Sequence, residues 1–404
     1  MTVLPRIGTR KHDQGGSVKI AIVNHIYLET ELSATTQLQV VRALNDLGHP
    51  TDLVVPSCEP VTPRAGEHVH RLRTWSRHPA LSTPSFNLTL LRRLGRLILR
   101  DRPDVVMVDH CSVAAALPYL ALSRLTRRFP RFVFDVRSQP VESSGMVGRL
   151  RVLQYLASLA VCARLMPGVT FLTRLMGQHE LRRVRARRSY GVWESGVDCE
   201  RFAPERWQSR GRELAEEQGL AGRFVVLYHG DVSPNRGLDL AVRAFAHLRD
   251  RGLEPAPVLA VLGDGSAAGD LQQLAQDLEA PVSFLGRVPY AQVPAYLAMS
   301  DVALMALPDH KDWRYQFPLK FAECMASGTP AIVSAIPAFT AIAGRSKAVI
   351  YVPEVTPEAI AESVACCVEH RACLGAWGAE GRALAEEYSW QRVAARLVAY
   401  LDTL

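Results

Sequence analysis

Short runs of apolar residues recur along the chain, and segments with the amphipathic pattern of helices separate them. Five runs lie in the first half: VKIAIVNH (18–25), TDLVVPS (51–57), PDVVMVDH (103–110), RFVFDVRS (131–138) and GVTFLT (168–173). Uninterrupted apolar runs of this length are typical of parallel strands that helices cover on both faces. The alternation of strand and helix patterns therefore predicts a parallel sheet between two helical layers.

The same alternation restarts after GVDCERFAPERW (196–207). Five further runs follow: RFVVLYHGD (223–231), VLAVLGDGS (258–266), VSFLGRVP (282–289), VALMALPD (302–309) and PAIVSAI (330–336). A chain of 404 residues is also long for a single core, so we expect two domains. The predicted fold is α/β, with two doubly wound, Rossmann-like domains facing across a cleft in which ligands bind.

A change in charge and the residues around Pro204 place the predicted domain boundary near residue 205. The C-terminal segment YSWQRVAARLVAYLDTL has a helical pattern with Ser389 at its N-cap. The predicted division is a disordered polar tail, two domains and a last helix, at residues 1–17, 18–205, 206–387 and 388–404.

The composition excludes several classes of protein. There is no run of about 18 or more apolar residues, so we expect no membrane span. The N-terminus also lacks the apolar stretch of a signal peptide. The eight cysteines show neither a CxxC pair nor ligand-like spacing with histidine. This pattern indicates reduced thiols in a cytoplasmic protein, with no disulfide framework and no structural zinc.

The net charge of +7 is unevenly distributed. Residues 1–205 carry 29 Lys and Arg against 17 Asp and Glu (+12), and residues 206–404 carry 18 against 23 (−5). The excess is mostly arginine, concentrated in residues 90–103 and 179–191. Two interpretations stay open: a solvated arginine-rich face, or attraction to anionic lipid head groups or a phosphorylated substrate. Nucleic acid ranks third, because neither a recognition motif nor interleaved aromatic residues accompany the basic runs.

The segment FPLKFAECMASGTPAIVS (317–334) carries the strongest candidate chemistry. Pro318 suits a first helical turn, and Gly328 ends the helix before a strand. Lys320 and Glu323 share a face near the helix start, where free N–H groups and the helix dipole favour phosphate. Glu323 could accept two hydrogen bonds from a cis-diol such as a ribose. The alternative is a surface Lys–Glu pair, worth only about 0.2–0.5 kcal/mol.

Three other turns follow predicted strands in the second half. In YHGDVSPNRGLDLAVRAF (228–245), Arg236 and Gly237 stand at the entry to a helix, where a forked guanidinium can grip a diphosphate. VLGDGS (261–266) is a glycine-rich turn, and FLGRVPYAQVPAYLAMSDVALMAL (284–307) contains a loop that could offer backbone groups to a base. Each of these, taken singly, is also compatible with an ordinary strand–loop–helix connection.

In this order, the four motifs resemble the nucleotide-binding half of the family 4 retaining glycosyltransferases of GT-B fold. The resemblance rests on Gly230 with Arg236-Gly237, Gly263-Asp264-Gly265, Gly286-Arg287-Val288-Pro289 and Pro318-x-Lys320-x-x-Glu323-x-Met325-Ala326-x-Gly328. It covers most of residues 170–404. It implies an acceptor-binding domain at 18–205, a nucleotide-sugar-binding domain at 206–387 and a last helix that crosses back to the first domain.

The resemblance also implies a role for each matched residue. Arg236 and Lys320 are expected to hold the diphosphate as catalytic residues, and Glu323 to bind the ribose hydroxyls. The other expected donor contacts are Gly230, Gly265, Arg287, Val288, Tyr315, Phe317, Pro318 and Leu319. Two positions depart from the family. Tyr315 stands where the family often has an acid that contacts the donor sugar, which leaves the donor sugar open. Asp231 stands where the family often has a basic residue, which leaves Arg236 and Lys320 with more of the phosphate charge to neutralise.

In the first half, RFVFDVRSQPVES (131–143) resembles the segment where related enzymes place charged or histidine side chains near the reacting sugar. Arg137 and His110 are candidate catalytic residues, although His110 is equally compatible with a partly buried strand end. NHIYLETELS replaces the usual glycine-rich turn after the first strand. The candidate acceptor-binding residues are Asn24, His25, Glu29 and Asp135.

These expectations describe a glycosyltransferase that moves a sugar from a nucleoside-diphosphate donor to an acceptor hydroxyl with retention. The acceptor could be a sugar, a lipid-linked saccharide or a small molecule, and peripheral contact with an anionic membrane is a further expectation. We expect no nucleic-acid partner, no cofactor besides the nucleotide sugar and no metal, because Arg236 and Lys320 would neutralise the leaving group. Two alternatives of the same fold stay open: a nucleotide-sugar epimerase or hydrolase, and a catalytically inactive nucleotide-binding scaffold.

Overall fold

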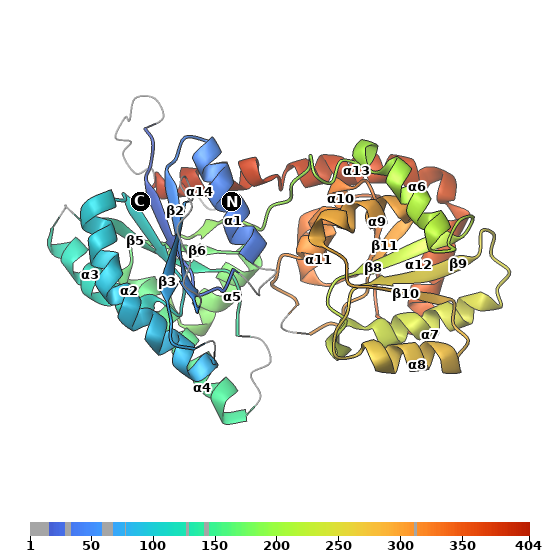
Figure 1. Ribbon diagram of the computed structural model, residues 1–404, viewed down its shortest axis with the longest axis horizontal. Helices are drawn as coiled ribbons and strands as arrows, with labels where there is room; N and C mark the ends of the chain where they lie inside the picture. The colour runs from blue at the N-terminus through green and yellow to red at the C-terminus, as the bar shows by residue number, and fades with distance from the viewer. Residues whose placement is uncertain are drawn as a thin grey trace.

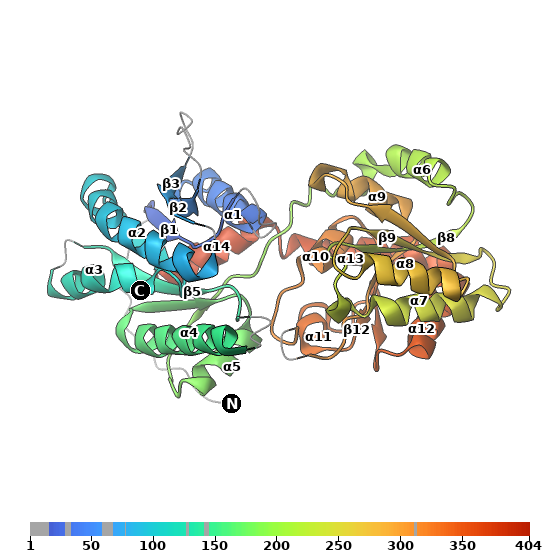
Figure 2. The same ribbon diagram turned by 60° about the horizontal axis from the view of Figure 1, so that its bottom comes forward.

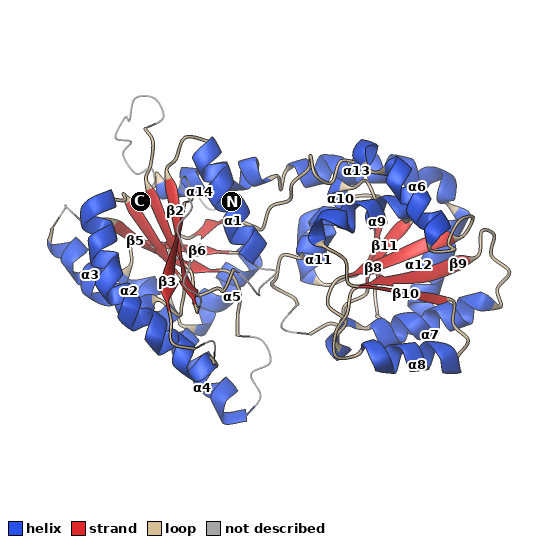
Figure 3. Ribbon diagram, viewed as in Figure 1, coloured by secondary structure: helices blue, strands red, loops and turns tan. Residues whose placement is uncertain are grey.

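Two parallel sheets, each enclosed by helices, form the two halves of the molecule (Figure 1). The computed structural model describes residues 16–28, 34–58, 68–76, 78–126, 129–140, 145–310 and 313–404. In each half the strands lie inside and the helices outside, as Figure 3 shows. The predicted α/β class, with two Rossmann-like sheets, is therefore confirmed. The predicted polar tail lies outside the described residues, except for residues 16 and 17.

The first sheet has the order β3-β2-β1-β4-β5-β6-β7, and all neighbouring strands are parallel. Its strands are β1 (Ile20–Val23), β2 (Thr51–Ser57), β3 (Val69–Arg73), β4 (Val105–Val108), β5 (Arg131–Val136), β6 (Gly168–Phe171) and β7 (Gly191–Val192). Its helices are α1 (Ala34–Asp46), α2 (Pro79–Asp101), α3 (Val113–Leu125), α4 (Gly145–Leu165) and α5 (Arg174–Arg183). Alternate strand residues are buried on opposite faces, so Ile20 and Ile22 pack with α1, whereas Ala21 and Val23 belong to the core beneath α2, α3 and α4.

The second sheet has the order β10-β9-β8-β11-β12-β13 and is also parallel throughout. Its strands are β8 (Phe224–His229), β9 (Pro257–Leu262), β10 (Val282–Gly286), β11 (Val302–Met305), β12 (Ala331–Ser334) and β13 (Val349–Val352). The helices are α6 (Gln208–Glu217), α7 (Leu238–Arg249), α8 (Ala268–Asp277), α9 (Val293–Met299), α10 (Leu319–Ala326), α11 (Pro337–Ala343), α12 (Pro357–Glu369) and α13 (Leu374–Glu386). Short 3₁₀ turns are η1 (Pro204–Arg206), η2 (Pro234–Arg236), η3 (Tyr290–Gln292) and η4 (Arg371–Cys373).

The last helix, α14 (Trp390–Leu401), packs against the first half of the molecule. Trp390, Val393 and Leu397 are buried in the same core cluster as strand residues of the first sheet. Figure 2 shows α14 beside α1, away from the second sheet. Ser389 occupies the N-cap position, but its side chain makes no capping hydrogen bond. The division of the chain at residue 205 stays a prediction.

Three strands have no counterpart among the predicted runs. Each lies at the edge of its sheet: β3 and β7 at the two edges of the first, and β13 at one edge of the second. The strand β3 buries only Val69 and Leu72 of its five residues, β7 has two residues, and the middle of β13 is half-buried. Edge strands need not be apolar on both faces, so β3 (VHRLR) lacks the continuous run that marks central strands, and β7 (GV) is too short to show one. The run VIYV of β13 is apolar throughout, and the sequence interpretation missed it.

Neither a membrane span nor a disulfide is found where the structure can be described. No described helix has the length and apolar character needed to cross a bilayer. All eight cysteines are free in the structure.

Candidate functional site

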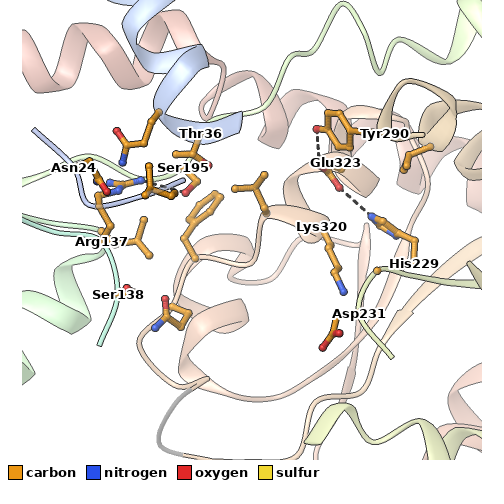
Figure 4. Close-up of a pocket in the computed structure, with 18 of the residues that line it drawn as sticks. Asn24, Thr36, Arg137, Ser138, Ser195, His229, Asp231, Tyr290, Lys320 and Glu323 are labelled. Carbon is orange, nitrogen blue, oxygen red and sulfur yellow. Dashed lines mark hydrogen bonds and ion pairs between the residues drawn. The ribbon is translucent and has the colours of Figure 1, made fainter. Parts of the chain in front are cut away.

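A cavity of about 630 Å³ opens between the two halves, at the C-terminal ends of strands from both sheets. This is where ligands of doubly wound sheets usually bind. Most of the predicted site residues line it: Asn24, His25, His110, Asp135, Arg137, Gly230, Arg287, Val288, Phe317, Leu319, Lys320 and Glu323. Figure 4 shows that Asn24 and Arg137 lie on one side of the cavity and Lys320 and Glu323 on the other.

Glu323 is held by two side chains from outside its own helix. It lies on α10 and is 4% exposed. Its Oε1 accepts a hydrogen bond of 2.7 Å from the Tyr290 hydroxyl, and its Oε2 lies 3.0 Å from Nε2 of His229. Burial alone would raise the pKa of Glu323, but His229, Tyr290 and Lys320 together hold it below its usual range. The carboxylate is therefore charged and already oriented in the absence of a ligand.

Lys320 lies in a narrow space that the backbone of Gly230 leaves open. Its Nζ is 4.9 Å from the centre of the Tyr228 ring. Gly230 has a φ of +118°, and a Cβ at that position would be 2.0 Å from the Lys320 Nζ, so only glycine fits. Burial lowers the pKa of Lys320 to about 8, and the nearby Arg236 cation acts in the same direction. The negative charge of a bound anion would offset both effects and raise the pKa of Lys320 again.

Arg236 does not line the cavity, although its charge reaches Lys320. The residue ends η2, just before Gly237 and α7. Its guanidinium lies 4.5 Å from the Trp313 ring centre, and Nη2 is 3.4 Å from Oδ2 of Asp231. Its Nε is buried and has no hydrogen-bond partner in the part of the chain that the structure describes. Arg236, which the sequence predicts to bind the diphosphate, is thus paired with Asp231, one of the two residues that depart from the family pattern.

Three other predicted donor residues also lie outside the cavity lining: Gly265, Tyr315 and Pro318. Pro318 occupies the N-cap position of α10. A Cβ on Gly265 would be 2.3 Å from the carbonyl oxygen of Val232, so this glycine permits two turns to pack closely. The Tyr315 ring stacks on His179 of the first half instead of entering the cavity. Their donor contacts stay predictions.

Across the cavity, Arg137 is fixed by the segment that follows β7. Its guanidinium stacks 3.5 Å from the centre of the Trp193 ring, donates to the Trp193 carbonyl and lies 3.2 Å from Oγ of Ser195. Asp135 lies beside it and is 4% exposed; its Oδ1 accepts hydrogen bonds from Thr170 Oγ1 (2.7 Å) and Trp193 Nε1 (2.9 Å). Burial lowers the pKa of Arg137 to about 10 and raises that of Asp135, while each charge partly offsets the effect on the other.

The remaining first-half predictions stand at the ends of β1 and β4. His25 Nε2 lies 2.8 Å from Ser82 Oγ, and the His25 backbone N–H donates to Asp109 Oδ2 at 2.8 Å. His110 packs edge-on against Tyr155 with ring centres 5.5 Å apart, and burial lowers its pKa despite the nearby Asp109 charge. Glu29 lies outside the described residues.

Several lining residues were missed by the sequence interpretation. They are polar side chains distant in sequence from the motifs, or placed inside a motif with no role assigned: Thr36, Gln37, Ser138, Ser195, His229 and Tyr290. His229 directly precedes Gly230, and Tyr290 follows GRVP, so their places beside these motifs could have marked them as site residues. Thr36 and Gln37 offered none beyond standing near the start of a helix.

The arrangement separates two kinds of chemistry. The wall built by the second half combines a cation, Lys320, with an oriented carboxylate, Glu323. This pairing suits a molecule with a phosphate group and a diol. The wall built by the first half is mainly uncharged and polar around Arg137. A molecule bound to one wall would face a molecule bound to the other.

Comparisons with known proteins agree with this arrangement. Residues 33–201 match the model described as Glycosyltransferase Family 4, and residues 223–370 match the model described as Glycosyl transferases group 1. The two matches cover both halves of the fold and meet at the cavity. In both halves, the chain is therefore similar to the family 4 group of glycosyltransferases, and its fold is GT-B.

Individual relatives are similar over part of the chain. A GDP-mannose-dependent α-(1-6)-phosphatidylinositol monomannoside mannosyltransferase from Mycolicibacterium smegmatis is 38% identical over 112 residues, 27% of this chain and 28% of that protein. The corresponding dimannoside mannosyltransferase from Mycobacterium tuberculosis is 31% identical over 215 residues, 52% of this chain and 51% of that protein. The chain thus matches about half the length of these relatives or less. The structure of Anabaena HepE in complex with UDP aligns with 96% of this chain and 100% of HepE, with a TM-score of 0.72 at 16% identity. This likeness shows that the two proteins share a fold.

Proposed function

We propose that the protein transfers a sugar from a nucleoside-diphosphate donor to an acceptor hydroxyl. The observation that carries the proposal is the placement of Lys320 and Glu323 in the first turns of α10, both lining a cavity shared by the two halves. Lys320 would neutralise the diphosphate, and Glu323 would accept hydrogen bonds from the ribose. The similarity to family 4 glycosyltransferases supports a transferase.

In the proposed reaction, the bond between the anomeric carbon and the diphosphate oxygen breaks, and its electron pair stays with the diphosphate. The acceptor oxygen forms the new bond to the anomeric carbon, and the acceptor proton passes to the departing diphosphate. Attack on the face that the diphosphate leaves gives retention. Lys320 acts by stabilising the charge that develops on the leaving group, with Arg236 close behind it. No metal is required in this proposal.

We take GDP-mannose as the first donor to test and an inositol-containing acceptor as the first acceptor class. Support comes from the two mycobacterial relatives, which are GDP-mannose-dependent mannosyltransferases of phosphatidylinositol mannosides. An epimerase or hydrolase of the same fold would consume the donor without any acceptor. Analysis of the products therefore separates these alternatives.

The experiment is calorimetric titration with GDP, UDP, ADP and TDP in the presence of a chelator, followed by a turnover assay. We expect one diphosphate to bind and the Lys320→Ala variant to lose turnover while keeping its fold. One such electrostatic contact is typically worth about 2.7–4 kcal/mol, or about a hundredfold to a thousandfold. Lys347→Ala is the matched control, because Lys347 is exposed and outside the cavity. If no diphosphate binds, the scaffold alternative is favoured.

We also propose that the protein sits peripherally on an anionic membrane at the cytoplasmic side. The support is an outer helical face formed by α2, α3 and α4. These helices carry eight arginines, four on α2, one on α3 and three on α4, against one acidic residue, Asp101. On α4, Met146, Leu150 and Leu153 are 79%, 60% and 64% exposed and fall at helical spacing on one side. Exposed apolar side chains among cations that far outnumber the acidic residues suit an interface with anionic lipid.

Co-sedimentation with vesicles tests the membrane contact. We expect binding to phosphatidylglycerol vesicles at low salt and little binding to phosphatidylcholine vesicles. The double variant Leu150→Ser, Leu153→Ser should lose most of the binding, whereas Arg212→Gln on α6, an exposed arginine of the other half, should bind like the natural protein. A protein that does not sediment with anionic vesicles at low salt contradicts the membrane contact and leaves the transfer reaction untouched.

A further inference from the structure

The first-half wall of the cavity has charged groups that the protein already satisfies. Asp109 accepts hydrogen bonds from the His25 backbone (2.8 Å), the Ser112 backbone (2.9 Å) and the Ser112 hydroxyl (2.5 Å). Asp135 is bonded to Thr170 and Trp193. Both carboxylates are therefore engaged within the protein and buried, Asp109 at 9% exposure and Asp135 at 4%.

The spare hydrogen-bonding capacity belongs to four uncharged side chains. Asn24, Thr36, Gln37 and Ser138 all line the cavity, and within the described residues none has a side-chain hydrogen bond to the protein. Thr36 and Gln37 lie in the first turn of α1, a helix of 13 residues, and Asn24 directly follows β1. Figure 4 shows Asn24 and Thr36 near Ser195 and Arg137 on one side of the cavity.

Gln37 is the exceptional member of this group. Its side chain is 3% exposed, yet among the described residues Oε1 is buried with no hydrogen-bond partner. An orphaned buried polar atom costs stability, so it indicates a partner that the ligand-free protein lacks. The missing partner has to donate a hydrogen bond to Oε1. A phosphate or carboxylate oxygen cannot do this, whereas a hydroxyl can, and a hydroxyl would also satisfy the amide if its oxygen and nitrogen were exchanged.

From this geometry we infer that the first-half wall is a binding site for a neutral polyol ring, a cyclitol or a pyranose, with Gln37 as its specificity-determining residue. Asn24, Thr36 and Ser138 each donate to or accept from a ring hydroxyl. Arg137, held by Trp193 and Ser195, keeps unused N–H donors for a further oxygen. This inference rests on the proposed function, because the ring would present its reacting hydroxyl to a donor bound at Lys320 and Glu323.

The variant Gln37→Leu tests the inference through two measurements, the melting temperature and the affinity for a polyol. Replacement of a residue with a merely structural role would not lower the affinity while leaving the melting temperature unchanged. Leucine removes the amide at similar volume, so the melting temperature should stay equal or rise. Affinity for a polyol should fall by about tenfold, the factor that corresponds to one hydrogen bond of about 1.4 kcal/mol. The affinity for the nucleoside diphosphate should not change. Gln272→Leu on α8 is the matched control, because Gln272 is exposed and does not line the cavity.

Saturation-transfer NMR with myo-inositol and methyl α-D-mannopyranoside, each with and without GDP, provides the measurement. Binding of at least one polyol to the natural protein, and its loss in Gln37→Leu, is the expected result. The inference is overturned if neither polyol binds, if Gln37→Leu binds as well as the natural protein, or if inorganic phosphate is the ligand that Gln37→Leu loses. Failure of the proposed function is a separate result, in which no nucleoside diphosphate binds the protein.

Discussion

The ring of Tyr315 stacks on the imidazole of His179, with ring centres 4.3 Å apart and planes inclined by 21°. His179 belongs to α5 of the first half, and Tyr315 to the loop between β11 and α10 of the second. A second contact joins the same loop to the first half, because Thr173 Oγ1 donates a hydrogen bond of 2.7 Å to the Tyr315 carbonyl. Gln316 and Phe317, which come next in the chain, line the cavity. The stack therefore ties the wall of the second half to the first half.

Replacing Tyr315 by alanine should loosen this connection and weaken nucleotide binding. An aromatic pair of this kind is worth about 0.5–1.5 kcal/mol beyond its buried area. We expect Tyr315→Ala to lower GDP affinity several-fold, and Tyr315→Phe, which keeps the ring, to bind normally. A double-mutant cycle with His179→Ala, read by calorimetry, checks the coupling. Strictly additive effects of the two substitutions would contradict a coupled pair.

Nucleotide affinity should fall at high pH because of Lys320. The pKa of this lysine is about 8 in the ligand-free protein, and a bound diphosphate raises it. Below pH 8 the lysine is already charged and affinity is at its maximum. Above pH 8 binding has to take up a proton, so affinity should drop by up to about tenfold per pH unit until the pKa of the complex is reached.

Calorimetry between pH 7 and 10 measures this dependence. The neutral variant Lys320→Met should bind GDP weakly at every pH and show no further drop above pH 8. An unchanged slope in Lys320→Met would assign the titration to another group.

Glu323 should account for recognition of the ribose. The substitution Glu323→Gln keeps the size of the side chain next to His229 and Tyr290 but removes the charge. Hydrogen bonds to a charged group contribute about 1.5–3 kcal/mol, so GDP should bind about tenfold to a hundredfold more weakly. Affinity for pyrophosphate, which has no ribose, should stay the same. If the affinities for GDP and pyrophosphate fell by the same factor, a specific contact between Glu323 and the ribose would be ruled out.

Removing the charge of Asp231 should strengthen diphosphate binding. Asp231 lies 3.4 Å from Arg236 and competes with a ligand phosphate for that guanidinium. Because the Asp231 side chain is 49% exposed, the pair is worth only about 0.2–1 kcal/mol, which predicts up to about a fivefold gain in GDP affinity for Asp231→Asn. Asp264→Asn, on the neighbouring turn, is the control for a general loss of negative charge in the cavity. Weaker binding by Asp231→Asn would mean that Asp231 itself contacts the donor.

The central strands and the α10 motif could be predicted from the sequence because their signals are local. A strand buried on both faces has to be a continuous apolar run, as in β1, β4 and β8. Lys320 and Glu323 stand out for the same reason, since their spacing on one short helix is visible in the chain itself.

Other features were decided only by the tertiary structure. The edge strands β3 and β7 have no continuous apolar run of their own, so their place in the sheet depends on pairing with a neighbouring strand. Tyr315 stands at a motif position, yet its ring packs on α5 because the loop after β11 passes the first half. Gln37 stands at an unremarkable helix start, and it becomes a candidate only because folding buries it against the cavity without a partner.

The sequence by itself determined the two α/β sheets, the family resemblance and one wall of the cavity. The tertiary structure decided how the residues of the other wall come together, with Thr36 and Gln37 among them, and which contacts join the halves. The physical reason is that helix and strand periodicity and phosphate-binding turns are set by neighbours along the chain. A cavity wall built from the ends of β1, β4 and β5 and the start of α1 joins residues more than a hundred positions apart, and only packing brings them together.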